Sequence, residues 1–108
     1  MKILVCGDRV FCDYTLLKRK LDKITSKLNK KPWIVTDGTA CGAAKLARKW
    51  AYERRITYQN FHEVPPTKIA NEYKVLVAFW TGYDQATKEH LKAARAKGKK
   101  AIIIDYEE

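Results

Sequence analysis

Short apolar runs alternate with longer amphipathic stretches along the chain. The runs are four or five residues long, are rich in isoleucine, valine and leucine, and are bounded by glycine or polar residues. Unbroken runs of this kind are typical of strands that are buried on both faces, as in parallel sheets. Five segments are therefore predicted to be strands, the third less clearly than the others: 3–6, 33–36, 57–61, 75–79 and 101–104.

The stretches between the strands have helical periodicity. In the first of them, four apolar residues at spacings of four, three and four share one helical stripe: Leu17, Leu21, Ile24 and Leu28. This helix is predicted to begin near Asp13, a favourable N-cap, and to end by Lys31, because a proline follows. Further helices are predicted over 42–54 and 86–97, with a short one over 67–73.

The alternation of these elements predicts an α/β fold made of a single Rossmann-like domain over residues 1–108. Right-handed crossovers give a five-stranded parallel sheet in the order 3-2-1-4-5, with helices on both faces. Ligands of such sheets bind beside the carboxyl ends of the strands, where the strand order reverses. Three loops lie there, at residues 7–9, 37–42 and 80–87.

The three loops supply the candidate ligand-binding residues: Gly7, Asp8, Arg9, Gly38, Thr39, Gly42, Trp80, Gly82, Tyr83 and Thr87. Free N–H groups where the second long helix begins favour a phosphate, and Thr39 adds a hydroxyl donor. Arg9 can pair with a phosphate or form an ion pair with a neighbouring aspartate. Asp8 can accept from a ribose hydroxyl or stabilise its turn. Trp80 and Tyr83 can stack on a base, although Trp80 is equally suited to the core.

Candidate catalytic residues are fewer than candidate binding residues. No Ser-His-Asp, Cys-His or paired-carboxylate pattern is present, and the only carboxylates that the loops place at the site are Asp8, Asp37 and Asp84. His90 lies well inside the last helix and is expected to be solvated. The three cysteines include no C-x-x-C pair, so neither a metal site nor a disulfide framework is predicted, and no cofactor is expected.

The chain is strongly basic, with 22 lysines and arginines against 12 acidic residues and a net charge of +10. Such a charge attracts anionic ligands and permits weak, non-specific binding of nucleic acids, although lysine-rich helix faces also serve solubility. Six lysines are candidates for a basic face: Lys18, Lys20, Lys23, Lys27, Lys30 and Lys31. No apolar run approaches the length of a membrane span, and a reducing cytoplasm is the expected location.

Three segments, in order along the chain, resemble motifs of the YspA-like branch of the SLOG superfamily. Residues 1–9 resemble its opening strand and Gly-Gly-Arg turn, with Asp8 at the second glycine. Residues 37–44 resemble its Gly-Gly-Ala-Arg-Gly-Ala-Asp motif, with Thr39 at the second glycine. Residues 78–88 resemble its Phe-Trp-Asp-Gly segment and the Gly-Thr pair that follows.

The resemblance implies a Rossmann-like domain, related to DprA and the Lonely-Guy phosphoribohydrolases, that binds nucleotides or nucleotide-derived signals and forms homodimers. One such ligand is an ADP-ribose-like or cyclic nucleotide signal, which the domain would sense or sequester. In the hydrolases a glutamate follows the Gly-Thr pair by three residues, where this chain has His90. Cys41 and Ala44 replace the arginine and aspartate of the second motif.

These departures favour binding over catalysis. Two alternatives remain open. One is N-glycoside hydrolysis of a nucleotide by one of the three aspartates. The other is a DprA-like module that binds nucleic acid.

Overall fold

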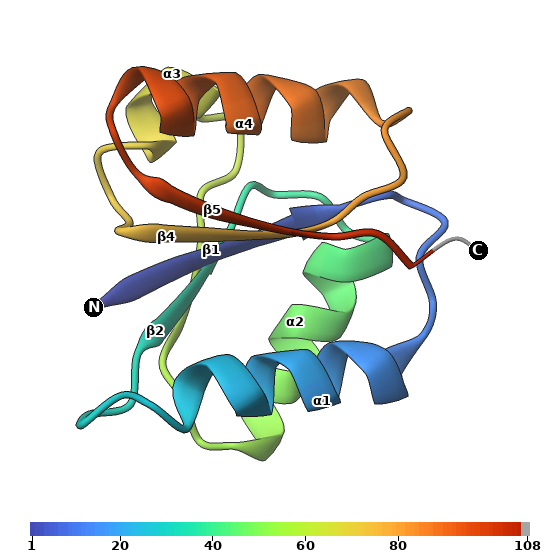
Figure 1. Ribbon diagram of the computed structural model, residues 1–108, viewed down its shortest axis with the longest axis vertical. Coiled ribbons are helices and arrows are strands. Elements are labelled where there is room, and N and C mark those ends of the chain that lie inside the picture. The colour runs from blue at the N-terminus through green and yellow to red at the C-terminus, as the bar shows by residue number, and fades with distance from the viewer. Residues whose placement is uncertain (107–108) are drawn as a thin grey trace.

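Every strand of the sheet runs parallel to its neighbours in the computed structural model, which describes residues 1–106 (Figure 1). The order across the sheet is β3-β2-β1-β4-β5, which confirms the predicted fold and topology. The strands are β1 (Lys2–Gly7), β2 (Trp33–Thr36), β3 (Tyr58–Asn60), β4 (Val75–Phe79) and β5 (Lys100–Ile104). The helices are α1 (Tyr14–Thr25), α2 (Gly42–Glu53), α3 (Pro66–Ile69) and α4 (Gln85–Ala96).

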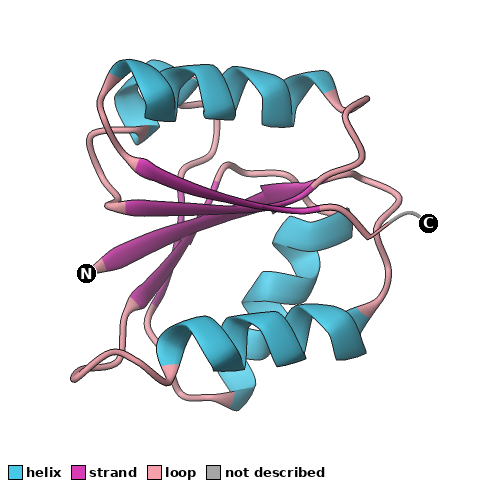
Figure 2. Cartoon of the chain, in the orientation of Figure 1, coloured by secondary structure: helices cyan, strands magenta, loops and turns pink. Residues whose placement is uncertain are grey.

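Helices cover the sheet on both faces, with α1 and α2 on one side and α3 and α4 on the other (Figure 2). Alternate residues of β1 therefore enter different halves of the core. Ile3 and Val5 pack in the cluster beneath α1 and α2, whereas Leu4 and Cys6 pack in the cluster beneath α3 and α4. This two-sided burial is the reason that the strand has no charged residue after Lys2. Within residues 1–106, no helix has both the length and the apolar character needed to cross a bilayer.

Helix α1 begins as predicted, because the Asp13 side chain accepts a hydrogen bond from the backbone N–H of Leu16. It ends earlier than the apolar stripe suggests. The hydroxyl of Thr25 donates to the carbonyl of Leu21, and Ser26 caps the last turn. Hydroxyl groups that bond to preceding carbonyls compete with helix propagation. Leu28 lies beyond the helix but still packs against the core.

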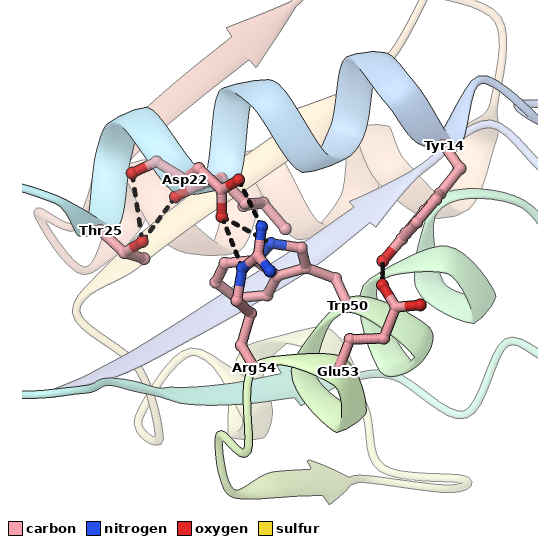
Figure 3. Close-up of polar contacts among 7 residues, drawn as sticks. Tyr14, Asp22, Thr25, Trp50, Glu53 and Arg54 are labelled. Carbon is pink, nitrogen blue, oxygen red and sulfur yellow. Dashed lines mark hydrogen bonds and ion pairs between the residues drawn. The ribbon is translucent and has the colours of Figure 1, made fainter.

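A cluster centred on Asp22 joins α1 to α2 (Figure 3). The Asp22 carboxylate accepts from the indole nitrogen of Trp50 at 3.0 Å and from Nε and Nη2 of Arg54 at 3.0 and 2.7 Å. The hydrogen bond from Arg54 is the main cause of the lowered pKa of Asp22. Trp50 is only 1% exposed, so Asp22 supplies the acceptor that its buried N–H requires. The hydroxyl of Tyr14 donates a further hydrogen bond to Oε1 of Glu53, which also joins the two helices.

Replacing Asp22 tests this connection. Asp22→Ala is expected to lower the free energy of unfolding by about 1–3 kcal/mol, because the indole N–H of Trp50 is left buried without an acceptor. Asp22→Asn keeps an acceptor at the same position and is expected to cost less. Urea denaturation followed by tryptophan fluorescence measures both. Equal losses in the two variants would contradict a dominant role for the indole hydrogen bond.

Candidate functional site

The three loops selected from the sequence do meet at the carboxyl edge of the sheet. Gly7 pairs with Phe79 at the ends of β1 and β4, and the N–H of Asp8 donates to the Phe79 carbonyl at 2.9 Å. The start of α2 approaches the same loop. A Cβ placed on Gly42 would lie 2.2 Å from the Asp8 carbonyl oxygen and 2.7 Å from Cα of Arg9. Only glycine permits this contact between the backbones.

Asp8 connects the loops to one another. Its side chain is 4% exposed, and Oδ2 accepts from the backbone N–H of Thr81 at 3.1 Å and from the Thr81 hydroxyl at 2.9 Å. The hydroxyl of Tyr106 donates to the same oxygen at 2.7 Å. The other oxygen, Oδ1, has no hydrogen-bond partner within residues 1–106. Asp8 thus joins the β1 loop, the β4 loop and the segment after β5.

The loop after β4 is held by its own polar groups. Asp84 is the N-cap of α4, and its Oδ2 accepts from the backbone N–H of Thr87 at 3.0 Å and from the Thr87 hydroxyl at 2.7 Å. The indole nitrogen of Trp80 donates to the Asp84 carbonyl at 3.1 Å, while its ring packs against the core. Trp80 and Thr87 therefore stabilise the loop, and their proposed contacts with a ligand stay predictions.

His90 is not solvated, so that expectation is wrong. It is 3% exposed, and its Nε2 lies 2.8 Å from Oδ2 of Asp37. A polar partner explains how a histidine fits on the buried side of α4. The spacing of Thr87, His90, Leu91 and Ala94 carries the signal for this burial, because these residues share one helical face. The partner could not be found from the sequence, since Asp37 lies 53 residues away.

The pair formed by Asp37 and His90 fixes the charge of Asp37. Burial alone would raise the pKa of this carboxyl group, but hydrogen bonds from His90 and Thr39 outweigh it and lower the pKa to about 2. Asp37 is therefore a carboxylate and accepts a hydrogen bond from the Nε2–H group of His90. Nearby, burial raises the pKa of the Cys6 thiol, and Asp37 and Asp84 add to the effect. Cys6 is thus a core residue, packed in the cluster beneath α3 and α4.

The loops leave little space at their centre. The cavity between Gly7, Arg9, Thr39 and Asp84 has a volume of about 10 Å³, roughly that of one water molecule. A much larger open groove of about 510 Å³ adjoins it, and we call it the tyrosine groove. Its lining residues are Asp8, Arg9, Val10, Thr81, Tyr83, Asp84 and Tyr106.

Exposed side chains flank this groove. Tyr83 is 85% exposed and Val10 82% exposed, although both have apolar surface. Arg9 is also exposed, and in the described part of the chain it forms no ion pair with Asp8 or Asp13. Sequence reasoning identified Arg9 and Tyr83 but missed Tyr106, which follows the last strand and is brought here only by the fold.

Gly38 and Thr39 lie on the other side of the central cavity. With Ala40 they line a separate pocket of about 170 Å³, together with Lys45 and Arg48 of α2 and Tyr58 and Asn60 of β3. Thr39 also borders the central cavity. The predicted ligand residues are therefore divided among three spaces, because Gly7 and Thr87 line only the central cavity. Gly82 is exposed at the tip of its loop, with no atom near a Cβ placed on it.

Comparison with known families identifies the class of the chain. Residues 1–63 match the model of the YAcAr family, described as the YspA, cpYpsA-related SLOG family. The match spans more than half of the chain, so the chain belongs to this family, and the resemblance seen in the motifs is confirmed. The matched region runs from β1 through β3 and includes two of the three site loops. No curated protein and no solved structure shows a significant match to the chain.

The close approach at Gly42 predicts a large effect of a single methyl group. Gly42 and Gly98 have nearly the same φ, +66° and +67°, but a Cβ at Gly98 would meet open space. Gly98→Ala is expected to cost about 1 kcal/mol from backbone strain alone. Gly42→Ala is expected to cost about 3 kcal/mol or more, because it also forces the two loops apart. Chemical denaturation compares the two, and similar losses would contradict the close contact.

The pair of Asp37 and His90 predicts a pH dependence. A carboxyl group whose pKa is about 2 in the folded state, against an ordinary 3.8, stabilises the fold above about pH 4 and loses this effect as the pH falls through 2. His90→Leu is expected to raise the pKa of Asp37 toward or beyond 3.8, because burial is then less opposed. NMR titration of the Asp37 carboxyl carbon measures it. His62→Leu, at the exposed histidine, is the control and should leave the pKa at about 2; an unchanged pKa in His90→Leu would contradict the assignment.

Proposed function

We propose that the chain binds a nucleotide or a nucleotide-derived ligand in the tyrosine groove. The observation that carries the proposal is the groove itself, which lies at the point where the strand order reverses and has a volume of about 510 Å³. That volume falls in the range of small-molecule sites, about 300–1,000 Å³. Membership of a SLOG family is consistent with a ligand of this class.

The lining of the groove suits the parts of a nucleotide. Tyr83 and Tyr106 offer aromatic faces for a base. Arg9 offers N–H donors to the oxygen or nitrogen acceptors of the ligand. Asp8 positions Thr81 and Tyr106, two of the groove walls, and its Oδ1 is a buried acceptor that has no donor among the described residues. A ribose hydroxyl or a base amino group has the matching chemistry.

The state of the three candidate carboxylates supports binding rather than cleavage. Asp8 accepts from Thr81 and Tyr106, and the carboxylate of Asp84 caps α4. Asp37 is paired with His90, at the position where the related hydrolases carry their glutamate. A general acid or nucleophile for an N-glycosidic bond must reach the scissile bond, and these three groups already have structural roles.

A ligand panel with matched tyrosine variants tests the proposal. The panel comprises nucleoside mono-, di- and triphosphates, NAD, ADP-ribose and its cyclic forms, and cyclic dinucleotides. A ligand at 100 times its Kd stabilises the folded state by about 2.7 kcal/mol, which thermal denaturation detects. Tyr83→Ala is expected to raise the Kd of a hit about tenfold, because base stacking is worth about 1–3 kcal/mol. Tyr52, 86% exposed on α2, provides the control in Tyr52→Ala.

The possible results are distinct. A hit weakened by Tyr83→Ala and not by Tyr52→Ala supports the groove, and recovery of the intact compound supports binding without cleavage. No stabilisation by any compound contradicts the proposal. Binding of an oligonucleotide that falls steeply with salt and is unchanged in Tyr83→Ala would favour the basic surface and the nucleic-acid alternative.

A further inference from the structure

A second pocket at the same edge of the sheet differs from the groove in its charge. It lies on the side of β2, α2 and β3, has a volume of about 170 Å³, and we call it the cationic pocket. Its lining residues are Gly38, Thr39, Ala40, Lys45, Arg48, Tyr58 and Asn60. Two of these residues are positively charged and none is acidic. The tyrosine groove, by contrast, has one arginine beside the carboxylates of Asp8 and Asp84.

The two cations act from one helix face. Lys45 and Arg48 are three residues apart on α2, so their side chains are neighbours. Both are exposed, and within residues 1–106 neither forms an ion pair with an acidic side chain. The Arg48 guanidinium lies over the ring of Tyr58, 5.9 Å from its centroid. This contact restrains the planar group while leaving its N–H donors available to an oxyanion.

Neutral donors complete the pocket. The Thr36 hydroxyl lies 2.6 Å from the Tyr58 hydroxyl and donates to Oδ1 of Asn60 at 3.0 Å. Since Thr36 has one hydroxyl proton, Tyr58 donates to Thr36, and the Asn60 amide is held by its oxygen. The amide nitrogen of Asn60 is thereby left with two N–H donors for the pocket. Thr39 adds a hydroxyl, and its backbone is fixed by the hydrogen bond to Asp37.

We propose that the cationic pocket binds a phosphate group. Lys45, Arg48, the Asn60 amide and the Thr39 hydroxyl together supply only hydrogen-bond donors and positive charge, the combination that a tetrahedral oxyanion requires. The pocket is large enough for a phosphate but smaller than a nucleotide site. The phosphate is either a free anion or, if the proposed function holds, the phosphate of the ligand in the tyrosine groove. Thr39 lines both the cationic pocket and the small central cavity, and that cavity shares Arg9 and Asp84 with the tyrosine groove.

Titration of ¹⁵N-labelled protein with inorganic phosphate, at ionic strength held constant with chloride, tests the site. Saturable NMR shifts are expected for the Thr39 and Ala40 amides, the Asn60 side-chain amide and Nε–H of Arg48. Arg48→Gln is expected to raise the Kd for phosphate at least tenfold. Arg95→Gln removes the same charge from α4 on the other face of the sheet and is expected to have no effect. Shifts spread over the lysines, or equal losses in the two variants, would overturn the proposal.

A second arm identifies the source of the phosphate, using a nucleoside monophosphate that the panel shows to bind and its parent nucleoside. If Arg48→Gln raises the Kd of the monophosphate at least tenfold and leaves the Kd of the nucleoside unchanged, the phosphate belongs to the ligand in the groove. If inorganic phosphate binds and no nucleotide does, the pocket binds a free anion. The proposed function is then overturned, and the inference about the cationic pocket stands. Nucleotide binding that is unaffected by Arg48→Gln, with no phosphate shifts in the pocket, overturns this inference and leaves the proposed function intact.

Discussion

The carboxylate of Asp8 joins the loops at the carboxyl edge of the sheet. It is buried at the end of the central strand, and it accepts three hydrogen bonds on one oxygen, from Thr81 and Tyr106. These partners come from segments that are far apart in the sequence, and the pairing of β1, β4 and β5 brings them to the same edge. Hydrogen bonds to an ionised carboxylate are stronger than those between neutral groups, and they offset the cost of removing the charge from water. The shape of the tyrosine groove depends on this one side chain.

The carboxyl edge of the sheet is also ordered by charge. The acidic groups are drawn inward, where Asp8, Asp37 and Asp84 each accept hydrogen bonds from the protein. The cations Arg9 and Arg48 remain exposed at opposite sides of the edge. At this edge, the three carboxylates thus have structural roles, while the two arginines stay accessible. Such an arrangement attracts anions to the surface while the interior of the edge stays rigid.

The fold could be predicted from the sequence because its signal is local. Four of the five strands contain a continuous apolar run, β3 being the exception, and strand order follows from the handedness of the connections. The loops that form the site were found by the same reasoning. The contacts within the site were not, because they join distant residues: Asp8 with Tyr106, and Asp37 with His90. Nothing near Lys45 and Arg48 in the sequence indicates a pocket. The fold forms it by placing Tyr58 and Asn60 of β3 beside them.

The pairing of His90 with Asp37 also bears on how the domain could change over evolutionary time. A glutamate at residue 90, as in the related hydrolases, would bring a second carboxylate against the buried and ionised Asp37. Two like charges in such a site disfavour each other, so a glutamate there would either stay protonated or displace Asp37 from its ionised state. An ionised glutamate at residue 90 therefore fits this fold only if Asp37 is replaced as well. The hydrogen bond between His90 and Asp37 makes the two positions interdependent.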